Sequence, residues 1–432
     1  MKAQIQYFYC MKKSAPVLYK LSSAIVDKSR TYDKETLHQA ARVVADTIGT
    51  AYSGVETDAF QRALKYKVEL FGNGNTKIIG TEETTSLGGA VFYSTLAISS
   101  TDYDEGHRKA VGHPASMIVP VAVILGEHLK VSKTEILKSV IIGYEIATRF
   151  SNSRIKEKIT TYSSGRWGAI GTAATASYLL NLAVEQTMHA LSNAAILSPS
   201  MLGGSTDVST GSMSKEGAAW AAQSGLQSTL ISKEDFVGPY LFVDDHDDYD
   251  NSILISNLGK SWLINTNYFK PYSCCRWLHS AVAAAIELRE EFNELSGIKI
   301  GIFSRAMDLI SNKYPKNPVQ AQFHLPYCVA VGLLYGEVTP KHFTIDSIRD
   351  KKVMAIIDRI TVDPDDSYNK LFPARLPSRV IIDNSGYAPL LKEVISAPWD
   401  ADNPPSDKAL YQKLVDQAGD DGIKLWDYLF NY

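Results

Sequence analysis

Apolar residues recur at helical spacing through the first 265 residues of the chain. The clearest stripe follows Asp33 and consists of Leu37, Ala40, Ala41, Val44, Ile48 and Ala51. Apolar positions three and four residues apart form one face of a helix, and aspartate is a common residue at a helix N-terminus. The same spacing predicts further helices at residues 115–129, 134–150, 168–182, 184–198 and 217–230. We therefore expect residues 1–265 to form a helical domain.

The pattern changes near Thr266. Residues 298–302 alternate between isoleucine and Lys or Gly, which is the spacing of a strand with one buried face. Similar runs occupy 359–362 and 379–382, and the second is followed by Asn-Ser-Gly, a sequence typical of a hairpin turn. Helices are predicted before the first run, at residues 278–293, and between the first two, at residues 321–335. The alternation indicates a smaller α+β domain over 266–392.

A last helix is predicted over 407–429, beyond a proline-rich connection. We therefore predict a mainly α fold in which residues 1–265 and 393–432 form one helical domain, and 266–392 are inserted as an α+β domain. A chain of 432 residues is long enough for two cores. The Gly- and Ala-rich helices offer more apolar surface than one helical layer covers, so we also expect a homodimer.

Composition narrows the classes of function. The chain is 45% hydrophobic and 21% charged with a net charge of −3, which is typical of a globular protein and lacks the basic excess of a nucleic-acid binder. No apolar run has the length of a membrane span or the form of a signal peptide. The chain has four cysteines, Cys10, Cys274, Cys275 and Cys328. Their spacing is not that of a disulfide framework or an iron–sulfur site, so we expect a cytoplasmic protein. The adjacent pair is expected to pack as small apolar residues.

One segment concentrates titratable side chains between two apolar stretches. Three carboxylates and two imidazoles fall within twelve residues: Asp102, Asp104, Glu105, His107 and His113. Such crowding shifts pKa values toward neutrality when the groups are buried together, as in a catalytic site. The alternative is a solvated loop whose charges merely repel one another.

Five segments in the same order resemble the MmgE/PrpD family, which includes 2-methylcitrate dehydratase and cis-aconitate decarboxylase. They are "DYDEGH…GHPASMIVPVAVILGE", "IIGYEIATR", "GSMSKEGAAWAAQSG", "YFKPYSCCRWLHSAV" and "AQFHLPYCVAVGLLYGE". The resemblance runs from about residue 45 to 399. It implies an all-helical domain with an inserted α+β lid, usually in a homodimer.

Four residues match functional positions of the family. Asp102 falls on the first carboxylate of its D-[FY]-D-D motif, and His113 on the histidine of its His-Pro step. Lys215 and Lys270 match two lysines, the second in the K-P-Y segment that opens the lid. The resemblance implies that the lysines bind substrate carboxylates while His113, oriented by Asp102, moves a proton. Asp102 acting as the base itself is an open alternative.

Other positions depart from the family pattern. Glu105 stands where the motif has a second aspartate, and Gly106 where many members have threonine. Tyr162 replaces a histidine of the decarboxylases and is either a core residue or a substitute proton donor. His324 stands where many members have serine. Its side chain either makes its hydrogen bonds within the helix or faces the pocket. His107 is a candidate for a second acid/base or a substrate contact.

The resemblance therefore predicts a lyase that needs neither metal nor organic cofactor and acts on a small carboxylate-bearing substrate. It would abstract a proton next to a carboxylate or carbonyl, as in dehydration, or decarboxylate the substrate. The loss of histidine at Tyr162 leaves open an epimerase, isomerase or cyclase. A catalytically silent binding protein is a third hypothesis, which the joint presence of Asp102, His113, Lys215 and Lys270 disfavours.

Overall fold

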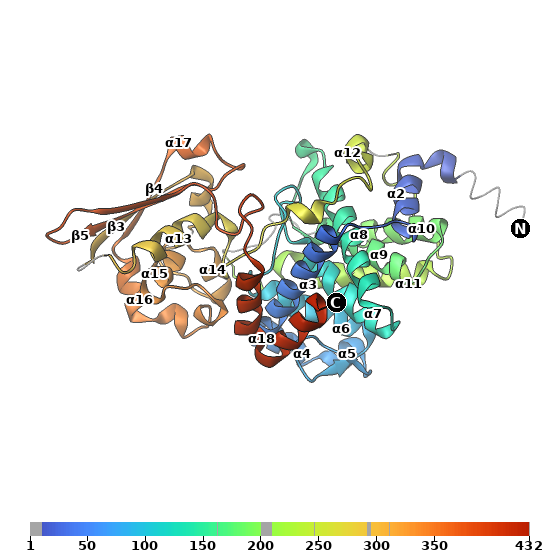
Figure 1. Cartoon of the computed structure of the whole chain (residues 1–432), viewed down its shortest axis with the longest axis horizontal. Coiled ribbons are helices and arrows are strands. Elements are labelled where there is room, and N and C mark those ends of the chain that lie inside the picture. The colour runs from blue at the N-terminus through green and yellow to red at the C-terminus, as the bar shows by residue number, and fades with distance from the viewer. Residues whose placement is uncertain are drawn as a thin grey trace, which may run out of the picture.

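The computed structural model describes residues 11–161, 163–199, 210–245, 247–291, 295–310 and 312–431. Its buried apolar side chains form two separate cores. The first core draws on residues between 11 and 269 and on the last helix, and the second on residues between 274 and 397. Figure 1 shows the two parts side by side, joined by extended connections.

The first part is helical, apart from one short antiparallel hairpin. Its elements are α2 (Pro16–Val26), α3 (Lys34–Gly54), α4 (Asp58–Leu64), α5 (Lys67–Phe71), β1 (Thr76–Lys77), β2 (Thr84–Thr85), α6 (Leu87–Ser100), α7 (Pro114–His128), α8 (Lys133–Asn152), α9 (Gly165–Leu179), α10 (Val184–Ile196), α11 (Ala218–Ser232) and α12 (Asn251–Ile255). The last helix, α18 (Asp407–Phe430), packs against α3, as the red and blue ribbons of Figure 1 show.

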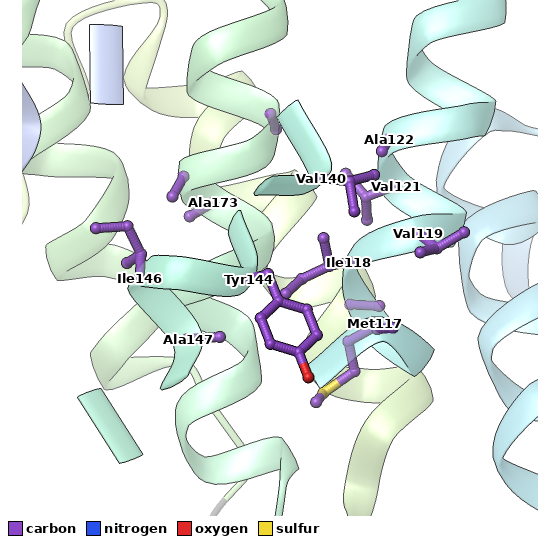
Figure 2. Packing of buried hydrophobic residues seen from close by; sticks show 14 of the residues in the cluster. Met117, Ile118, Val119, Val121, Ala122, Val140, Tyr144, Ile146, Ala147 and Ala173 are labelled. Carbon is purple, nitrogen blue, oxygen red and sulfur yellow. The ribbon is translucent and has the colours of Figure 1, made fainter. Parts of the chain in front are cut away.

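Small residues bring the central helices α8, α9 and α11 close together. A Cβ atom on Gly143 would lie 1.9 Å from Thr175 Oγ1, and one on Gly225 would lie 1.8 Å from Thr172 Oγ1. The small side chains of these helices thus allow their backbones to approach closely. Figure 2 shows the neighbouring layer of this core, where the ring of Tyr144 lies beside side chains of α7.

The second part contains a four-stranded sheet in the order β4-β3-β5-β6, with helices packed against it. Its elements are α13 (His279–Leu288), β3 (Leu295–Ile302), α14 (Pro318–Phe323), α15 (Leu325–Tyr335), α16 (Lys351–Ile357), β4 (Ile360–Pro364), α17 (Asp366–Asn369), β5 (Ser378–Asn384) and β6 (Leu390–Val394). Strand β3 pairs in parallel with β4 and antiparallel with β5, which pairs antiparallel with β6. We refer to residues 266–397 as the lid.

The mainly α fold class with a smaller α+β part is confirmed. Asp33 caps α3 as predicted, since its side chain accepts a hydrogen bond from Thr36 N at 2.6 Å. The helix predicted over 321–335 is wrong in one respect, because it is divided at His324 into α14 and α15. Pro326 in the first turn of α15 cannot donate to the ladder and disfavours helical backbone before it. The predicted helix over 278–293 ends at Leu288.

The domain boundaries at residues 266 and 392 stay a prediction, which the division of the apolar core supports. Several elements were not predicted individually, among them the β1–β2 hairpin, strand β6 and the helices α2, α6 and α16. In the described ranges, no helix combines the length and the apolar character needed to cross a bilayer.

Candidate functional site

The titratable segment forms the connection between α6 and α7, and residues of the lid side hold it from three directions. Ser273 Oγ donates to the carbonyl of Thr101, and Gln322 Nε2 donates to the carbonyl of Ser100 at 2.9 Å. Further along, Gly106 and Tyr268 exchange two backbone hydrogen bonds of 3.1 and 2.9 Å. The segment therefore lies at the junction of the two parts rather than in solvent.

Asp102 is buried in this junction between two lysines. Its Oδ1 lies 3.3 Å from Lys215 Nζ and its Oδ2 lies 2.8 Å from Lys270 Nζ. Burial alone would raise the pKa of Asp102, but the two ammonium groups outweigh burial and hold it well below its usual range. Burial lowers the pKa of Lys270, and the carboxylate of Asp102 reverses this and raises it above normal. The three side chains form one ionised cluster.

Lys215 reaches Asp102 from a strained turn that precedes α11. Lys215, Glu216 and Gly217 have φ values of 32°, 57° and 67°, all in the left-handed region that non-glycine residues seldom adopt. Ser163 Oγ donates to the carbonyl of Glu216, and Ser164 N donates to Glu216 Oε2 at 2.9 Å. Backbone strain of this kind is concentrated at functional sites.

His113 lies at the start of α7 and is held through one ring nitrogen. Its Nδ1 is 2.8 Å from the carbonyl oxygen of Glu105 and 3.3 Å from Asp104 Oδ2. Since both neighbours accept hydrogen bonds, Nδ1 carries a proton. Nε2 is 4.0 Å from Asp102 Oδ1. Burial lowers the pKa of His113, but the carboxylate of Asp104 outweighs it and raises the pKa to about 10. Nδ1 is therefore hydrogen-bonded to the Glu105 carbonyl and has the Asp104 carboxylate as its charged neighbour, while Asp102 faces Nε2.

Glu105 points away from the junction into the helical core. Its Oε1 accepts a hydrogen bond from Ala115 N at 2.9 Å, and its Oε2 accepts from the hydroxyl of Tyr144 at 2.7 Å and from Asn267 Nδ2 at 3.3 Å. Burial raises the pKa of Glu105 to about 8, although Tyr144 and Ala115 act in the opposite direction. Glu105 thus ties the segment to α7 and α8. Gly106 is required beside it, because a Cβ there would lie 2.2 Å from Tyr268 Oη.

The two remaining candidate histidines have structural partners on both ring nitrogens. His107 Nδ1 accepts from the amides of Lys109 and Ala110 at 3.2 and 3.3 Å, and Nε2 lies 3.0 Å from Thr266 Oγ1. Burial lowers the pKa of His107 to about 3, so the ring is neutral.

His324 caps α15, with Nδ1 accepting from Tyr327 N at 3.1 Å and Nε2 lying 2.8 Å from the carbonyl of Asn312. Burial lowers the pKa of His324 as well. His107 lines the cavity described next, and His324 is not among the residues that do. Tyr162 lies outside the described residues.

A cavity of about 540 Å³ lies between the ionised cluster and the aromatic part of the lid. One wall carries Asp102, His113 and Glu216 from the helical domain and Lys270 from the start of the lid. Its lid wall carries Arg276, Trp277, Phe323, Phe372 and Leu376. The four residues expected to act together thus meet at one place, with Lys215 directly behind Asp102.

Sequence reasoning missed the contributions of Asp104, Glu216 and the aromatic wall of the lid. Asp104 lay within the titratable segment, so its presence was visible but its partner was not. Glu216 follows Lys215 directly, without a motif of its own. The aromatic side chains have no shared spacing, because separate lid elements supply them. Across the described ranges, no group of three or more His, Cys, Asp or Glu side chains is arranged to hold a metal ion.

The pair of cysteines at the start of the lid divides between core and cavity. Cys274 is buried in the lid core, as expected for a small apolar residue. Cys275 is half-buried and contributes to the cavity wall. Both thiols are free. Burial raises the pKa of Cys275 to about 12, so this thiol is un-ionised near neutral pH.

Comparison with known proteins gives two domain matches along the chain. The MmgE/PrpD N-terminal domain matches residues 23–255, and the MmgE/PrpD C-terminal domain matches residues 272–420. Cis-aconitate decarboxylase of Homo sapiens is 23% identical over 365 residues, covering 78% of this chain and 75% of that protein.

Two fungal proteins are similarly distant relatives. The cis-aconitate decarboxylase-like protein oryM of Aspergillus oryzae is 20% identical to this chain. The match covers 88% of this chain and 85% of oryM. Cis-aconitate decarboxylase of Aspergillus terreus is 19% identical, covering 89% and 85%. These relatives support a lyase of dehydratase or decarboxylase type at the level of the family. With both domain matches in chain order, this protein belongs to the MmgE/PrpD family.

Proposed function

We propose that the protein is a cofactor-free lyase that acts on a small carboxylate-bearing substrate through a carbanion next to a carboxylate or carbonyl. The observation that carries this proposal is one cluster of Asp102, His113, Lys215 and Lys270 beside a cavity, which Lys215 adjoins through Asp102, although these residues lie up to 168 positions apart in the sequence. Two ammonium groups and one imidazole around a cavity suit a reaction that builds negative charge on its substrate.

The lysines stabilise that charge. Lys270 lines the cavity and is 1% exposed, so its ammonium acts where little water screens it. A substrate carboxylate approaching Lys270 shares the ammonium with Asp102. Lys215, on the far side of Asp102, keeps that carboxylate from becoming an unpaired buried charge as the substrate binds.

His113 supplies a proton. Asp104 raises the pKa of His113 to about 10 against the effect of burial, so the ring is an imidazolium near neutral pH. Asp104 faces Nδ1 and leaves the Nε2 proton available to the substrate. Decarboxylation needs no base at the start: the C–C bond breaks, its electrons remain on carbon as CO₂ leaves, and the carbon then takes the Nε2 proton. Dehydration also needs a base. Asp102 is a weak base, because both of its carboxylate oxygens are paired with ammonium groups. The charge state of His113 therefore favours decarboxylation among the family's reactions.

The test is turnover of cis-aconitate and of 2-methylcitrate by the purified chain and its variants. We expect His113→Ala to lower kcat by about 10²–10⁴ with the fold intact, as for loss of a general acid. Lys270→Ala should mainly raise KM if Lys270 binds only the ground state. His128→Ala, at the exposed end of the same helix, is the matched control and should leave both constants unchanged. Full activity of His113→Ala on a turned-over substrate would refute this mechanism.

The alternatives give different results in the same assays. A large loss of kcat in Tyr162→Phe would assign this hydroxyl a proton-transfer role and support the epimerase, isomerase or cyclase alternative. An unchanged kcat would leave Tyr162 as a packing residue. If no carboxylate is turned over but one binds, the silent binding protein is the better description.

A further inference from the structure

The lid wall of the cavity is aromatic and rigidly packed. The Trp277 and Phe372 rings meet edge to face with centroids 5.3 Å apart, and Phe303 stacks behind Phe372 at 4.4 Å. Leu376, 1% exposed, continues the same wall. Aromatic side chains fixed by their neighbours offer a large apolar surface at little entropic cost. A substrate made only of carboxylates and hydroxyls would leave this wall without a partner.

A second apolar feature of the cavity comes from the helical domain. Val111 lines the cavity, is 53% exposed and has φ 52°, a conformation that is a clear outlier for a β-branched residue. The backbone turn between His107 and Gly112 holds it there through paired hydrogen bonds. An apolar side chain kept at a cavity mouth by a strained backbone indicates contact with a ligand.

Lys109, Arg108, Lys270 and Arg276 line the cavity, and the last three are already paired with carboxylates. Lys270 is paired with Asp102 at 2.8 Å, Arg108 with Asp402 at 3.1 Å, and Arg276 with Asp400. Glu216 adds another carboxylate to the lining. A tricarboxylate would bring three negative charges among these side chains. A substrate with one or two carboxylates needs fewer additional positive charges to neutralise it.

The volume points the same way. A cavity of about 540 Å³ falls in the range of about 300–1,000 Å³ typical of sites for drug-sized ligands. It exceeds what an acid of the size of aconitate fills, and the aromatic side chains of the lid are part of its lining.

We propose that the substrate is an amphipathic acid: its carboxylate end faces Lys270 and His113, and an aromatic or bulky alkyl group packs between Trp277, Phe372 and Val111. This inference rests on the proposed function, because the reacting end is the same. It adds that the lid wall selects the substrate by its apolar group.

The test compares three probe acids by calorimetric titration of the full chain: succinate, 2-benzylsuccinate and cis-aconitate. We expect 2-benzylsuccinate to bind at least about tenfold more tightly than succinate, since the benzyl group loses its contact with water against the wall. It should also bind more tightly than cis-aconitate. Equal affinities of the two succinates, or tightest binding of cis-aconitate, would overturn the inference.

Variants locate the effect. Trp277→Leu should reduce the preference for 2-benzylsuccinate to less than about threefold while leaving succinate affinity unchanged. Trp220→Leu is the matched control, because Trp220 on α11 is 45% exposed and outside the cavity lining, and it should keep the full preference. Phe372→Leu provides a second variant should Trp277→Leu fail to fold, as judged by circular dichroism.

Lys270→Met separates this inference from the proposed function. Suppose that Lys270→Met no longer binds either succinate and that Trp277→Leu keeps the full preference for 2-benzylsuccinate. This result would refute the proposed substrate class and would still support the proposed reactive site. Unchanged binding of both acids in Lys270→Met would refute the proposed site itself. Failure of all three acids to bind the unaltered protein at millimolar concentration would count against both.

Discussion

Replacing Asp104 with asparagine should turn His113 from a cation into a neutral ring near neutral pH. The rise of the His113 pKa from 6.5 to about 10 corresponds to about 5 kcal/mol at 1.36 kcal/mol per pH unit. Burial acts against this rise, so the interaction with the Asp104 carboxylate, 3.3 Å from Nδ1, exceeds the net effect. The asparagine amide would fill the same space without the charge. We expect the pKa of His113 to fall by more than about 3 pH units, to neutrality or below.

Nuclear magnetic resonance titration of histidine-labelled protein measures this directly, with the His113 signal identified by its absence in His113→Gln. Asp383→Asn is the matched control, since Asp383 forms a surface ion pair with Lys299 at 3.5 Å on the far sheet of the lid. The activity of Asp104→Asn should decline at a lower pH than that of the unaltered protein, as the proton donor is lost. A His113 pKa within about half a pH unit of the original value would refute the role assigned to Asp104.

The free energy of unfolding should depend on pH through the same protonation of His113. His113 has a folded-state pKa of about 10 against 6.5 when unfolded, so its contribution is fully present below pH 6.5 and is lost as pH rises toward 10. Glu105, whose pKa burial raises from 4.5 to about 8, acts in the same direction between those values. Urea unfolding should show stability falling by up to about 1.4 kcal/mol per pH unit for His113 between pH 7 and 9. Asp104→Asn should flatten this slope.

Three further predictions concern stability, metal dependence and assembly. Lys413→Met should cost about 3–5 kcal/mol in urea unfolding, because Lys413 Nζ lies 2.6 Å from the fully buried Asp46, whereas Lys424→Met on the exposed face of the same helix should cost almost nothing. Activity should survive exhaustive chelation, and a stoichiometric metal lost together with activity would contradict the metal-free mechanism. Light scattering should give about twice 47.6 kDa at micromolar concentration, and a mass equal to 47.6 kDa would contradict the predicted homodimer.

The sequence predicted those parts of the molecule whose signal is local. The stripe after Asp33 and the alternation at 298–302 depend only on near neighbours, and both elements formed where expected. Asp102 and His113 were found because titratable residues cluster within one segment. The division at His324 was missed, because apolar periodicity outweighed the proline that follows two residues later.

Contacts between distant segments could not be read in the same way. Asp104 and Asp102 are equally plausible partners of His113 by sequence, and only the left-handed backbone at Asp102 turns that side chain toward the lysines. The cavity wall at Trp277 and Phe372 is similarly hidden, since separate turns of the lid bring the two rings together.

The contact of Lys413 with the loop at Tyr103 has a consequence for the order in which the molecule matures. Lys413 Nζ donates to the carbonyl of Tyr103 at 2.8 Å, so the residue next to Asp102 is held by a helix that follows every other part of the site in the sequence. Lys215 and Lys270, the partners of Asp102, precede this helix. Because a chain is synthesised from its N-terminal side, the contact at Tyr103 can form only after the charged partners of the site have been made. Premature termination before residue 413 would yield a chain that carries every proposed catalytic group and still lacks a finished site.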